Sequence, residues 1–404
     1  MPILKASSDM YGTENDRPAE IPTDLLGGIG MKIKAAVLRE CGLPHPYRDS
    51  RPLNIETINL DGPERDEVLI KIKAAGLCHS DLVAIDGERP KPMPIVLGHE
   101  AAGIVEKCGP GVTDFEVGDT VVPSFVASCG RCDMCRTGQP ALCHPASVSN
   151  AAGTLIGGYC RLHKNGQKIF HHSGVAAFAE YAVLSQYSLV KIEDDIPAKH
   201  AALFGCGVIT GVGAVLNSSE IKVGDTVVVV GLGGVGLSAV MAAEAAGAAK
   251  IIGLDINQFK LQTAKAFGAT DVFDATNADV IAQVKEVTQG GAHIAIESAG
   301  VPKALELAFA VTRAGGSTVA AGLPNPERTI NISHFILAAH ERKLRGSYMG
   351  SCIPSRDIPK FIELYRRGKL RVDKLASETI GFEDLNEAFD KLSEGNTLRN
   401  VLVF

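Results

Sequence analysis

The sequence has neither an excess of positive charge nor a long apolar run. Its 404 residues include 40 Lys and Arg against 46 Asp and Glu, a net charge of −6, so no basic surplus is available to bind a nucleic-acid backbone. The sequence contains no run of 18 or more uncharged, apolar residues, which is about the length that a membrane-spanning helix needs. Ten cysteines are too few, in a chain of this length, for a disulfide-rich secreted scaffold. We therefore expect a globular protein with no nucleic-acid partner and no membrane association.

The first thirty residues are acidic and rich in Pro, Ser and Gly, and they have no apolar core of the kind that a secretory signal needs. Regular patterning begins at Met31. We interpret residues 1–30 as an N-terminal extension and expect a cytoplasmic protein. Because a single hydrophobic core stops growing beyond about 250–300 residues, the rest of the chain should form two domains.

Two patterns of hydrophobicity divide the chain. Between residues 31 and about 200, short alternating segments bounded by turn residues predict strands. From about residue 208, strands and helices alternate, which predicts right-handed βαβ units and a parallel sheet. The predicted strands are 68–72, 102–106, 118–122, 226–230, 250–254, 293–297, 317–321 and 399–404, and the predicted helices are 237–246, 258–267, 359–367 and 382–392.

Four closely spaced cysteines, Cys129, Cys132, Cys135 and Cys143, form the clearest motif. Thiolates at three-residue steps followed by a fourth can close a tetrahedral shell around one zinc ion. The alternatives are disulfides, an iron–sulfur cluster and a nucleic-acid zinc knuckle. The low cysteine density, the different ferredoxin spacings and the lack of basic and aromatic neighbours argue against each of them in turn. The spacing therefore predicts a structural zinc lobe at residues 128–144.

A glycine-rich turn, Gly-Leu-Gly-Gly-Val-Gly at residues 231–236, follows the predicted strand 226–230. In a dinucleotide fingerprint the first glycine makes the tight turn, the second lets the backbone approach the pyrophosphate, and the third lets the helix pack on the strand. Asp255, at the end of the next strand, can accept both ribose hydroxyls and would repel a 2′-phosphate. The pattern predicts a site for NAD rather than NADP, with its glycine-turn contacts at Gly231, Gly233, Gly234, Val235 and Gly236.

Three further motifs carry zinc-ligand residues: Gly-Leu-Cys-His-Ser-Asp at 76–81, Gly-His-Glu-Ala-Ala-Gly at 98–103 and Gly-Cys-Gly-Val-Ile-Thr-Gly at 205–211. Together with the cysteine lobe and the glycine turn, they make the chain, from about residue 32 to 404, resemble the zinc-dependent medium-chain alcohol dehydrogenases in their long form. The resemblance makes Cys78, His99 and Cys206 the ligands of a catalytic zinc, the Cys2His set for which alcohol dehydrogenase is the standard example. It assigns the four cysteines of the lobe to a structural zinc.

The resemblance also implies an α/β fold with two domains. A GroES-like, β-rich catalytic domain would comprise residues 31–207 and 350–404, and a Rossmann domain with a doubly wound parallel sheet would comprise residues 208–349. The implied activity is reversible oxidation of a primary alkyl, allylic or aryl alcohol to the aldehyde by hydride transfer to NAD. The alternatives are a thiol-linked formaldehyde dehydrogenase acting on S-hydroxymethyl glutathione or mycothiol, and a non-catalytic protein that binds NAD and zinc.

Individual roles follow from the matching positions. Ser80 would take the alcohol proton, Asp81 would orient His99, and Glu100 would be a transient zinc ligand. Phe125 would line the substrate pocket, and Val83 stands where many members have a proton-relay histidine. The further cofactor contacts implied are His79, Thr210, Lys260 and Arg399.

Residues outside these motifs receive structural roles. We expect His171 and His172 to be structural or to line the pocket, and Cys41, Cys108, Cys160 and Cys352 to be free thiols. The long segment between Cys143 and Phe178 is typical of dimeric members. We therefore expect a homodimer, with a tetramer as the alternative, in which edge strands at residues 317–321 pair across a two-fold axis.

Overall fold

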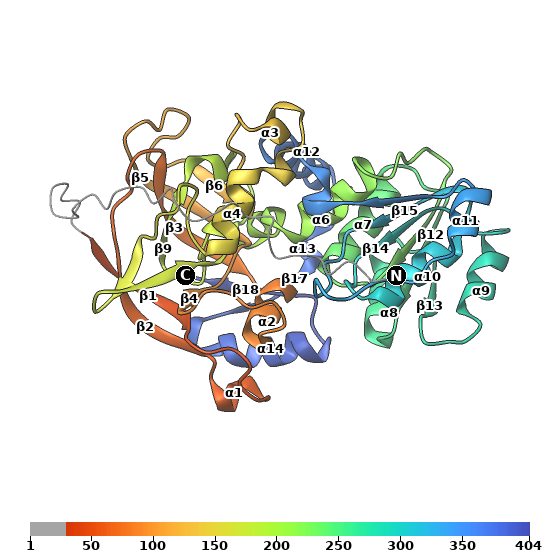
Figure 1. The fold of residues 1–404 in the computed structure, drawn as a ribbon, viewed down its shortest axis with the longest axis horizontal. Coiled ribbons are helices and arrows are strands. Elements are labelled where there is room, and N and C mark those ends of the chain that lie inside the picture. The colour runs from red at the N-terminus through yellow and green to blue at the C-terminus, as the bar shows by residue number, and fades with distance from the viewer. Residues whose placement is uncertain (1–29) are drawn as a thin grey trace, which may run out of the picture.

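The computed structural model describes residues 30–404, so nearly all of the predicted N-terminal extension lies outside the described residues. Figure 1 shows two lobes side by side. One contains the strands of the first half of the chain together with the C-terminal strands, and the other contains a sheet flanked by helices. This is the mixed α/β architecture that the two patterns of hydrophobicity predict.

The β-rich lobe combines a small closed barrel with a seven-stranded sheet. Strand β3 lies near the centre of that sheet, and its buried Val68, Ile70 and Ile72 alternate along the strand as expected for one face against the core. The last strand, β18, pairs antiparallel with β3, so the C-terminus completes the lobe that the N-terminal half begins. The strands are β1 (Met31–Leu38), β2 (Leu53–Leu60), β3 (Glu67–Gly76), β4 (Ile95–Val96), β5 (Ala101–Cys108), β6 (Thr120–Pro123), β7 (Leu162–Lys164), β8 (Gln167–His171), β9 (Tyr181–Ser185), β10 (Leu189–Ile192), β17 (Ala376–Ile380) and β18 (Arg399–Val403).

The second lobe holds a six-stranded parallel sheet in the order β13-β12-β11-β14-β15-β16. In chain order this is 3-2-1-4-5-6, the doubly wound arrangement in which ligands bind at the carboxyl ends of the strands where the order reverses. The central strand β11 is a run of valines buried under helices on both faces. The strands are β11 (Thr226–Val230), β12 (Lys250–Asp255), β13 (Asp271–Asp274), β14 (Ala292–Glu297), β15 (Thr312–Ala320) and β16 (Lys343–Gly346), with helices α7 (Gly234–Ala245), α8 (Gln258–Ala266), α9 (Val280–Val287), α10 (Pro302–Val311) and α11 (His334–Ala339).

Helix α6 (Gly207–Leu216) joins the lobes and packs against α7. Gly211 faces α7 so closely that a Cβ atom there would collide with the carbonyl oxygen of Val235, so glycine is required at this crossing. Within residues 30–404 no single helix is long and apolar enough to cross a membrane, although the bent pair 198–205 and 207–216 reaches that length and apolarity together. The remaining helices are α1 (Tyr47–Ser50), α2 (His79–Asp86), α3 (Asp133–Arg136), α4 (His144–Ala152), α5 (Ala198–Ala201), α12 (Pro354–Arg366), α13 (Val372–Leu375) and α14 (Leu385–Glu394).

Most predicted elements are present, and the differences have local causes. The predicted strands 226–230 and 250–254 are β11 and β12. Helix α12 begins five residues before the predicted start at 359, because Pro354 supplies the fixed φ that suits a first helical position. The prediction that residues 317–321 form an edge strand is wrong. Residues 317–320 belong to β15, which lies between β14 and the short strand β16, and β16 is the edge of the sheet.

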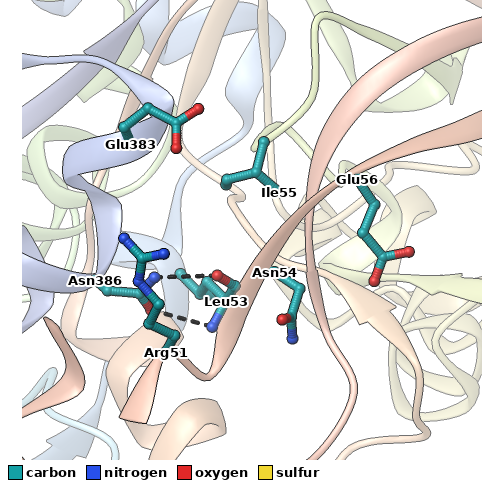
Figure 2. Close-up of a pocket in the computed structure, with 7 residues that line it drawn as sticks. All are labelled: Arg51, Leu53, Asn54, Ile55, Glu56, Glu383 and Asn386. Atoms are coloured by element: carbon teal, nitrogen blue, oxygen red, sulfur yellow. Dashed lines mark hydrogen bonds between the residues drawn. The ribbon is translucent and has the colours of Figure 1, made fainter. Parts of the chain in front are cut away.

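A polar hollow of about 310 Å³ lies on the β-rich lobe, between β2 and the start of α14 with the turn that precedes it (Figure 2). It contains none of the site residues predicted from the sequence. Its lining residues are Arg51, Leu53, Asn54, Ile55, Glu56, Glu383 and Asn386.

Candidate functional site

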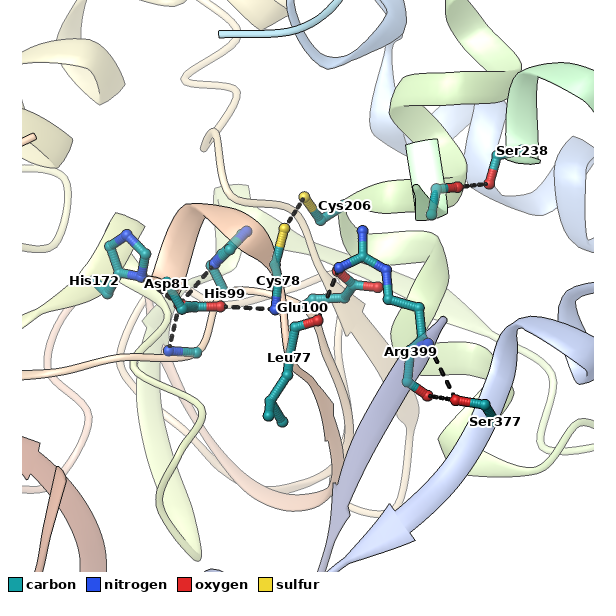
Figure 3. Close-up of polar contacts among 12 residues, drawn as sticks. Leu77, Cys78, Asp81, His99, Glu100, His172, Cys206, Ser238, Ser377 and Arg399 are labelled. Carbon is teal, nitrogen blue, oxygen red and sulfur yellow. Dashed lines mark hydrogen bonds and ion pairs between the residues drawn. The ribbon is translucent and has the colours of Figure 1, made fainter. Parts of the chain in front are cut away.

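Cys78, His99 and Cys206 come from three separate segments and meet in the interior (Figure 3). Cys78 is the N-cap of α2, His99 precedes β5, and Cys206 precedes α6. Their ligand atoms all lie within 4.8 Å of one another, and all three residues are buried. The fold thus gathers the Cys2His set that the sequence motifs predict.

The spacing of the two thiols fits a metal shell. Their Sγ atoms are 3.9 Å apart. That is too far for a disulfide, whose sulfur atoms are about 2.05 Å apart, and close to the edge of about 3.8 Å of a zinc tetrahedron with bonds of about 2.3 Å. The hydrogen bond from Cys206 and the positive charge of Arg399 lower the pKa of the Cys78 thiol, which favours the thiolate that a metal requires. These residues fit a zinc ion with one coordination position left open.

Asp81 anchors both the helix and the histidine. Its Oδ2 accepts the backbone N–H of Cys78 at 3.2 Å, which caps the first turn of α2. Its Oδ1 lies 3.1 Å from Nδ1 of His99, so the other ring nitrogen of His99 is left for a metal. Burial disfavours the charged carboxylate, but the contacts with His99 and His172 outweigh it and lower the pKa of Asp81.

Glu100 lies directly behind the cluster with its carboxylate buried. Within the described chain, neither of its side-chain oxygens has a hydrogen-bond partner. Burial raises the pKa of Glu100 to about 8. The nearest cation is Arg399, whose Nη1 is 4.0 Å from Oε2 of Glu100 and donates to the carbonyl of Leu77 at 2.8 Å. A buried carboxylate without a hydrogen-bond donor suits an adjacent cation, as a zinc ion would be.

The glycine turn has the geometry of a dinucleotide site. Gly231 adopts a φ of 89° and a Cβ there would collide with Ala299, whereas the space around Gly233 is open. The backbone at Gly233 can therefore approach a ligand at the N-terminus of α7, where the helix favours negative charge. The guanidinium of Arg399 lies against Gly207 and Gly234, the first residues of α6 and α7, where a side chain would collide with it.

Asp255 ends β12 beside this turn. Its carboxylate accepts the backbone N–H groups of Leu232 at 2.6 Å and Asn257 at 2.9 Å, so its orientation is fixed before any ligand binds. Lys260 lies in the first turn of the following helix α8, and Thr210 lies on α6. The structure describes no contact between these two side chains and Asp255.

The polar residues of α2 lie at its start. His79 is exposed and Ser80 partly exposed, so both side chains are accessible beside the buried Cys78.

Phe125 presents its ring edge-on to His99, with ring centroids 5.9 Å apart. Tyr348, which the sequence motifs did not single out, packs edge-on against Phe125 at 5.7 Å. An aromatic wall therefore extends outward from the metal-ligand cluster.

The four cysteines of the lobe form a second cluster around α3. The Sγ atoms of Cys129 and Cys135 are 3.9 Å apart, those of Cys132 and Cys143 are 4.0 Å apart, and all four lie within 4.8 Å of one another. Among the described residues every cysteine is free. Four thiols at the edge length of a zinc tetrahedron fit a closed structural site.

His172 is a functional candidate for which sequence reasoning gave only a structural or lining role. Its Nδ1 lies 2.9 Å from Oδ1 of Asp81, the oxygen that also contacts His99. The pairing joins positions 91 residues apart, so no local spacing signals it.

Comparisons with known proteins match two separate segments of the chain to two family models. The profile of the alcohol dehydrogenase GroES-like domain matches residues 64–194, and that of the zinc-binding dehydrogenases matches residues 234–367. The NDMA-dependent alcohol dehydrogenase of Amycolatopsis methanolica is 40% identical over 92% of this chain and 99% of its own. The chain belongs to the zinc-dependent medium-chain alcohol dehydrogenase family. Zinc-dependent oxidation of an alcohol is therefore the activity of this enzyme.

Two further relatives of this chain have names that specify a substrate. The S-(hydroxymethyl)glutathione dehydrogenase of a Synechocystis species is 36% identical over 92% of the chain and 100% of its own. The crystal structure of benzyl alcohol dehydrogenase from Acinetobacter calcoaceticus superposes with a TM-score of 0.86 at 34% identity, over 93% of this chain and 99% of that one. Both likenesses extend over the two lobes.

Proposed function

We propose that this enzyme oxidises a primary alcohol to the aldehyde with NAD as hydride acceptor, and that each chain holds two zinc ions. Cys78, His99 and Cys206 would hold the catalytic zinc, and the four cysteines of the lobe would hold the structural one. The observation that carries the proposal is the buried cluster of only three ligands, because a catalytic zinc needs one open position for its substrate.

The roles of the protein groups follow from their positions. When bound, zinc polarises the alcohol oxygen and NAD accepts the hydride from the alcohol carbon. Ser80, partly exposed in the first turn of α2, accepts the alcohol's proton and passes its own hydroxyl proton on to water. Asp81 keeps Nδ1 of His99 occupied and so fixes the direction of its other ring nitrogen. Val83, buried in the same helix, has no titratable group, so the proton leaves Ser80 without a histidine at this position.

The aromatic wall favours an apolar alcohol. Phe125 and Tyr348 pack edge-on in a row that starts at His99, and aromatic rings favour flat or apolar ligands in such contacts. The likeness to a benzyl alcohol dehydrogenase supports an aryl or allylic substrate. The test is an initial-rate series over primary alcohols of increasing size, with NAD alone and with NAD plus NDMA. Rates that rise from ethanol to benzyl alcohol support the proposal, and no turnover of any primary alcohol would reject it.

A thiol adduct of formaldehyde is the second candidate substrate. The loop after α2 carries two cations, Arg89 and Lys91, that could meet the carboxylates of glutathione or mycothiol. Burial raises the pKa of Tyr348 and the positive charge of Arg89 opposes that shift, so Arg89 lies near one residue of the aromatic wall. Formaldehyde should be oxidised only in the presence of the thiol if this candidate is right. The Synechocystis relative supports including both thiols in the screen.

The coenzyme assignment rests on Asp255. Its carboxylate is oriented by two backbone N–H groups and still has lone pairs for the ribose hydroxyls. A 2′-phosphate would meet like charge at this position, so we propose NAD as the coenzyme.

For the assembly we propose a homodimer built through β16 instead of residues 317–321. This edge strand is exposed along its length, and pairing two such edges would extend the two sheets into one. Light scattering of the full chain and of a form starting at Met31 tests the dimer, and a tetramer in both would reject it.

We also propose a reducing, cytoplasmic location, because none of the ten cysteines forms a disulfide.

A further inference from the structure

The carboxylate of Asp81 receives four donors in the protein interior (Figure 3). Three come from the segments that carry zinc ligands: the backbone N–H groups of Cys78 and Gly98, at 3.2 and 3.0 Å, and Nδ1 of His99 at 3.1 Å. The fourth is Nδ1 of His172 at 2.9 Å, which comes from the turn after β8. Asp81 and both histidines are almost completely buried, so water does not compete for these hydrogen bonds.

We infer that His172 is a positioning residue for the catalytic zinc site: its Nδ1–H holds Oδ1 of Asp81 in the place from which that oxygen orients His99. The inference rests on the proposed function, because it assumes zinc on Cys78, His99 and Cys206. Oδ1 of Asp81 could rotate toward other donors if only the helix cap at Oδ2 held the carboxylate. Besides the backbone N–H of Gly98, His172 supplies a further buried donor to Oδ1 that limits this freedom. Partners of this kind tune metal affinity by about 10–100-fold.

The state and orientation of His172 suit this role. The buried ring contacts a carboxylate oxygen, which only accepts hydrogen bonds, so Nδ1 of His172 carries the proton that this contact requires. Its ring packs edge-on against that of His99, with centroids 5.0 Å apart, so a displacement of one ring would also displace the other.

Asp81, His99 and His172 could instead be read as ligands of a separate metal ion, because their ligand atoms also lie within 4.8 Å of one another. The distances favour hydrogen bonds. Oxygen and nitrogen ligands on a zinc tetrahedron with bonds of about 2.0–2.1 Å would be about 3.3 Å apart. The observed 2.9 and 3.1 Å are hydrogen-bond lengths, and Oδ1 also accepts the N–H of Gly98.

Two substitutions separate hydrogen bonding from packing. In His172→Asn the side-chain amide can reproduce the Nδ1 donor but the ring is lost. In His172→Phe the ring is kept but the donor is lost, and His172→Leu takes its place if His172→Phe does not fold. His171→Gln is the matched control, because the buried neighbour His171 uses Nε2 to accept the N–H of Arg161 at 3.0 Å and does not contact Asp81.

The measurement is the rate at which zinc leaves the holoenzyme to a coloured chelator, followed separately for the two zinc ions, together with the absorption spectrum of enzyme carrying cobalt at the catalytic site. We expect His172→Phe to release the catalytic zinc about 10–100-fold faster, with an altered cobalt spectrum and unchanged release from the four-cysteine lobe. His172→Asn and His171→Gln should stay within about threefold of the wild type.

Release from His172→Phe at the wild-type rate, or faster release from His172→Asn than from His172→Phe, would overturn the inference. Faster release of both zinc ions would do the same, because it would indicate a general loss of stability. A third metal ion per chain would favour the separate metal site. Wild-type enzyme without zinc on its Cys2His cluster would reject the proposed function itself, which this experiment detects before any variant is compared.

Discussion

Exchanging the carboxylate of Asp255 for an amide should remove most of the enzyme's preference for NAD. A phosphate on the ribose 2′ position carries a charge of about −1.5 to −2. At about 4 Å from a carboxylate, each unit of that charge costs about 1 kcal/mol at the dielectric constant of water and about 4 kcal/mol at an effective value of 20. A total of about 3 kcal/mol is a reasonable middle value for Asp255, which is 8% exposed. Since 1.4 kcal/mol is a factor of about ten, the wild type should prefer NAD by about a hundredfold in kcat/KM.

In Asp255→Asn the charge disappears and one oxygen acceptor remains. The backbone N–H groups of Leu232 and Asn257, which both donate to the carboxylate in the wild type, must then share that acceptor. We expect kcat/KM for NAD to fall about tenfold, because hydrogen bonds of this kind contribute about 1 kcal/mol each. The value for NADP should stay level or rise, so the preference should shrink to tenfold or less.

The assay is initial-rate kinetics with both coenzymes at a fixed, saturating alcohol concentration. Asp271→Asn is the matched control, because Asp271 starts the neighbouring strand β13 at the end of the sheet away from the glycine turn. The control should keep the wild-type preference. Wild-type kcat/KM values within threefold of each other, or an unchanged preference in Asp255→Asn, would refute the role assigned to this carboxylate.

Three further predictions concern stability and assembly. Cys132→Ser should cost one zinc ion per chain and lower Tm by several degrees while kcat of the folded enzyme stays within about threefold; lost activity at unchanged Tm would contradict the division between the two zinc sites. Leu344→Asp, on the edge strand β16, should halve the mass measured by light scattering, and an unchanged mass would remove β16 from the interface. The hydrogen bonds from Arg39 and Lys164 lower the pKa of Glu56 to about 2, so its contribution to stability is complete above the unfolded pKa near 4.5 and disappears as the pH falls toward 2. The urea stability of Glu56→Gln should thus be about 1 kcal/mol lower than that of the wild type from pH 8 to 5, and the gap should close below pH 4.5; a gap that widens in acid would contradict this.

Local spacing made the four-cysteine lobe and the glycine turn predictable, whereas the cluster of Cys78, His99 and Cys206, whose members lie on separate segments, was predicted from the resemblance to the family. The four cysteines of the lobe are close in sequence, so any compact loop brings them together. The glycine turn depends on backbone conformation. Glycine adopts a positive φ readily, so the residue type at position 231 already indicates the positive φ that the structure shows. The valine run of β11 likewise predicts a buried parallel strand without knowledge of its neighbours.

Features that depend on tertiary contacts were not predictable in this way. His172 contacts Asp81 only because the turn after β8 packs beside α2. Tyr348 reaches Phe125 from a segment more than two hundred residues later in the chain. The edge strand β16 has the sequence Lys-Leu-Arg-Gly, which is too short and too charged for a clear strand pattern, and it is a strand because β15 offers it a free edge. The pairing of Arg399 with Glu100 also needs β18 to return beside β3.

Cys78 is the residue on which the proposed catalytic zinc site depends most directly. Zinc content and hydride transfer from a primary alcohol should be measured side by side on the wild type and on Cys78→Ser, with NADH binding followed by fluorescence as the check on the fold. We predict two zinc ions per chain and alcohol-dependent reduction of NAD in the wild type. In Cys78→Ser we predict one zinc ion, no detectable turnover and NADH binding within about threefold of normal. A wild type with a single zinc or with iron, or a Cys78→Ser variant that turns over within tenfold of the wild type, would contradict the central claim.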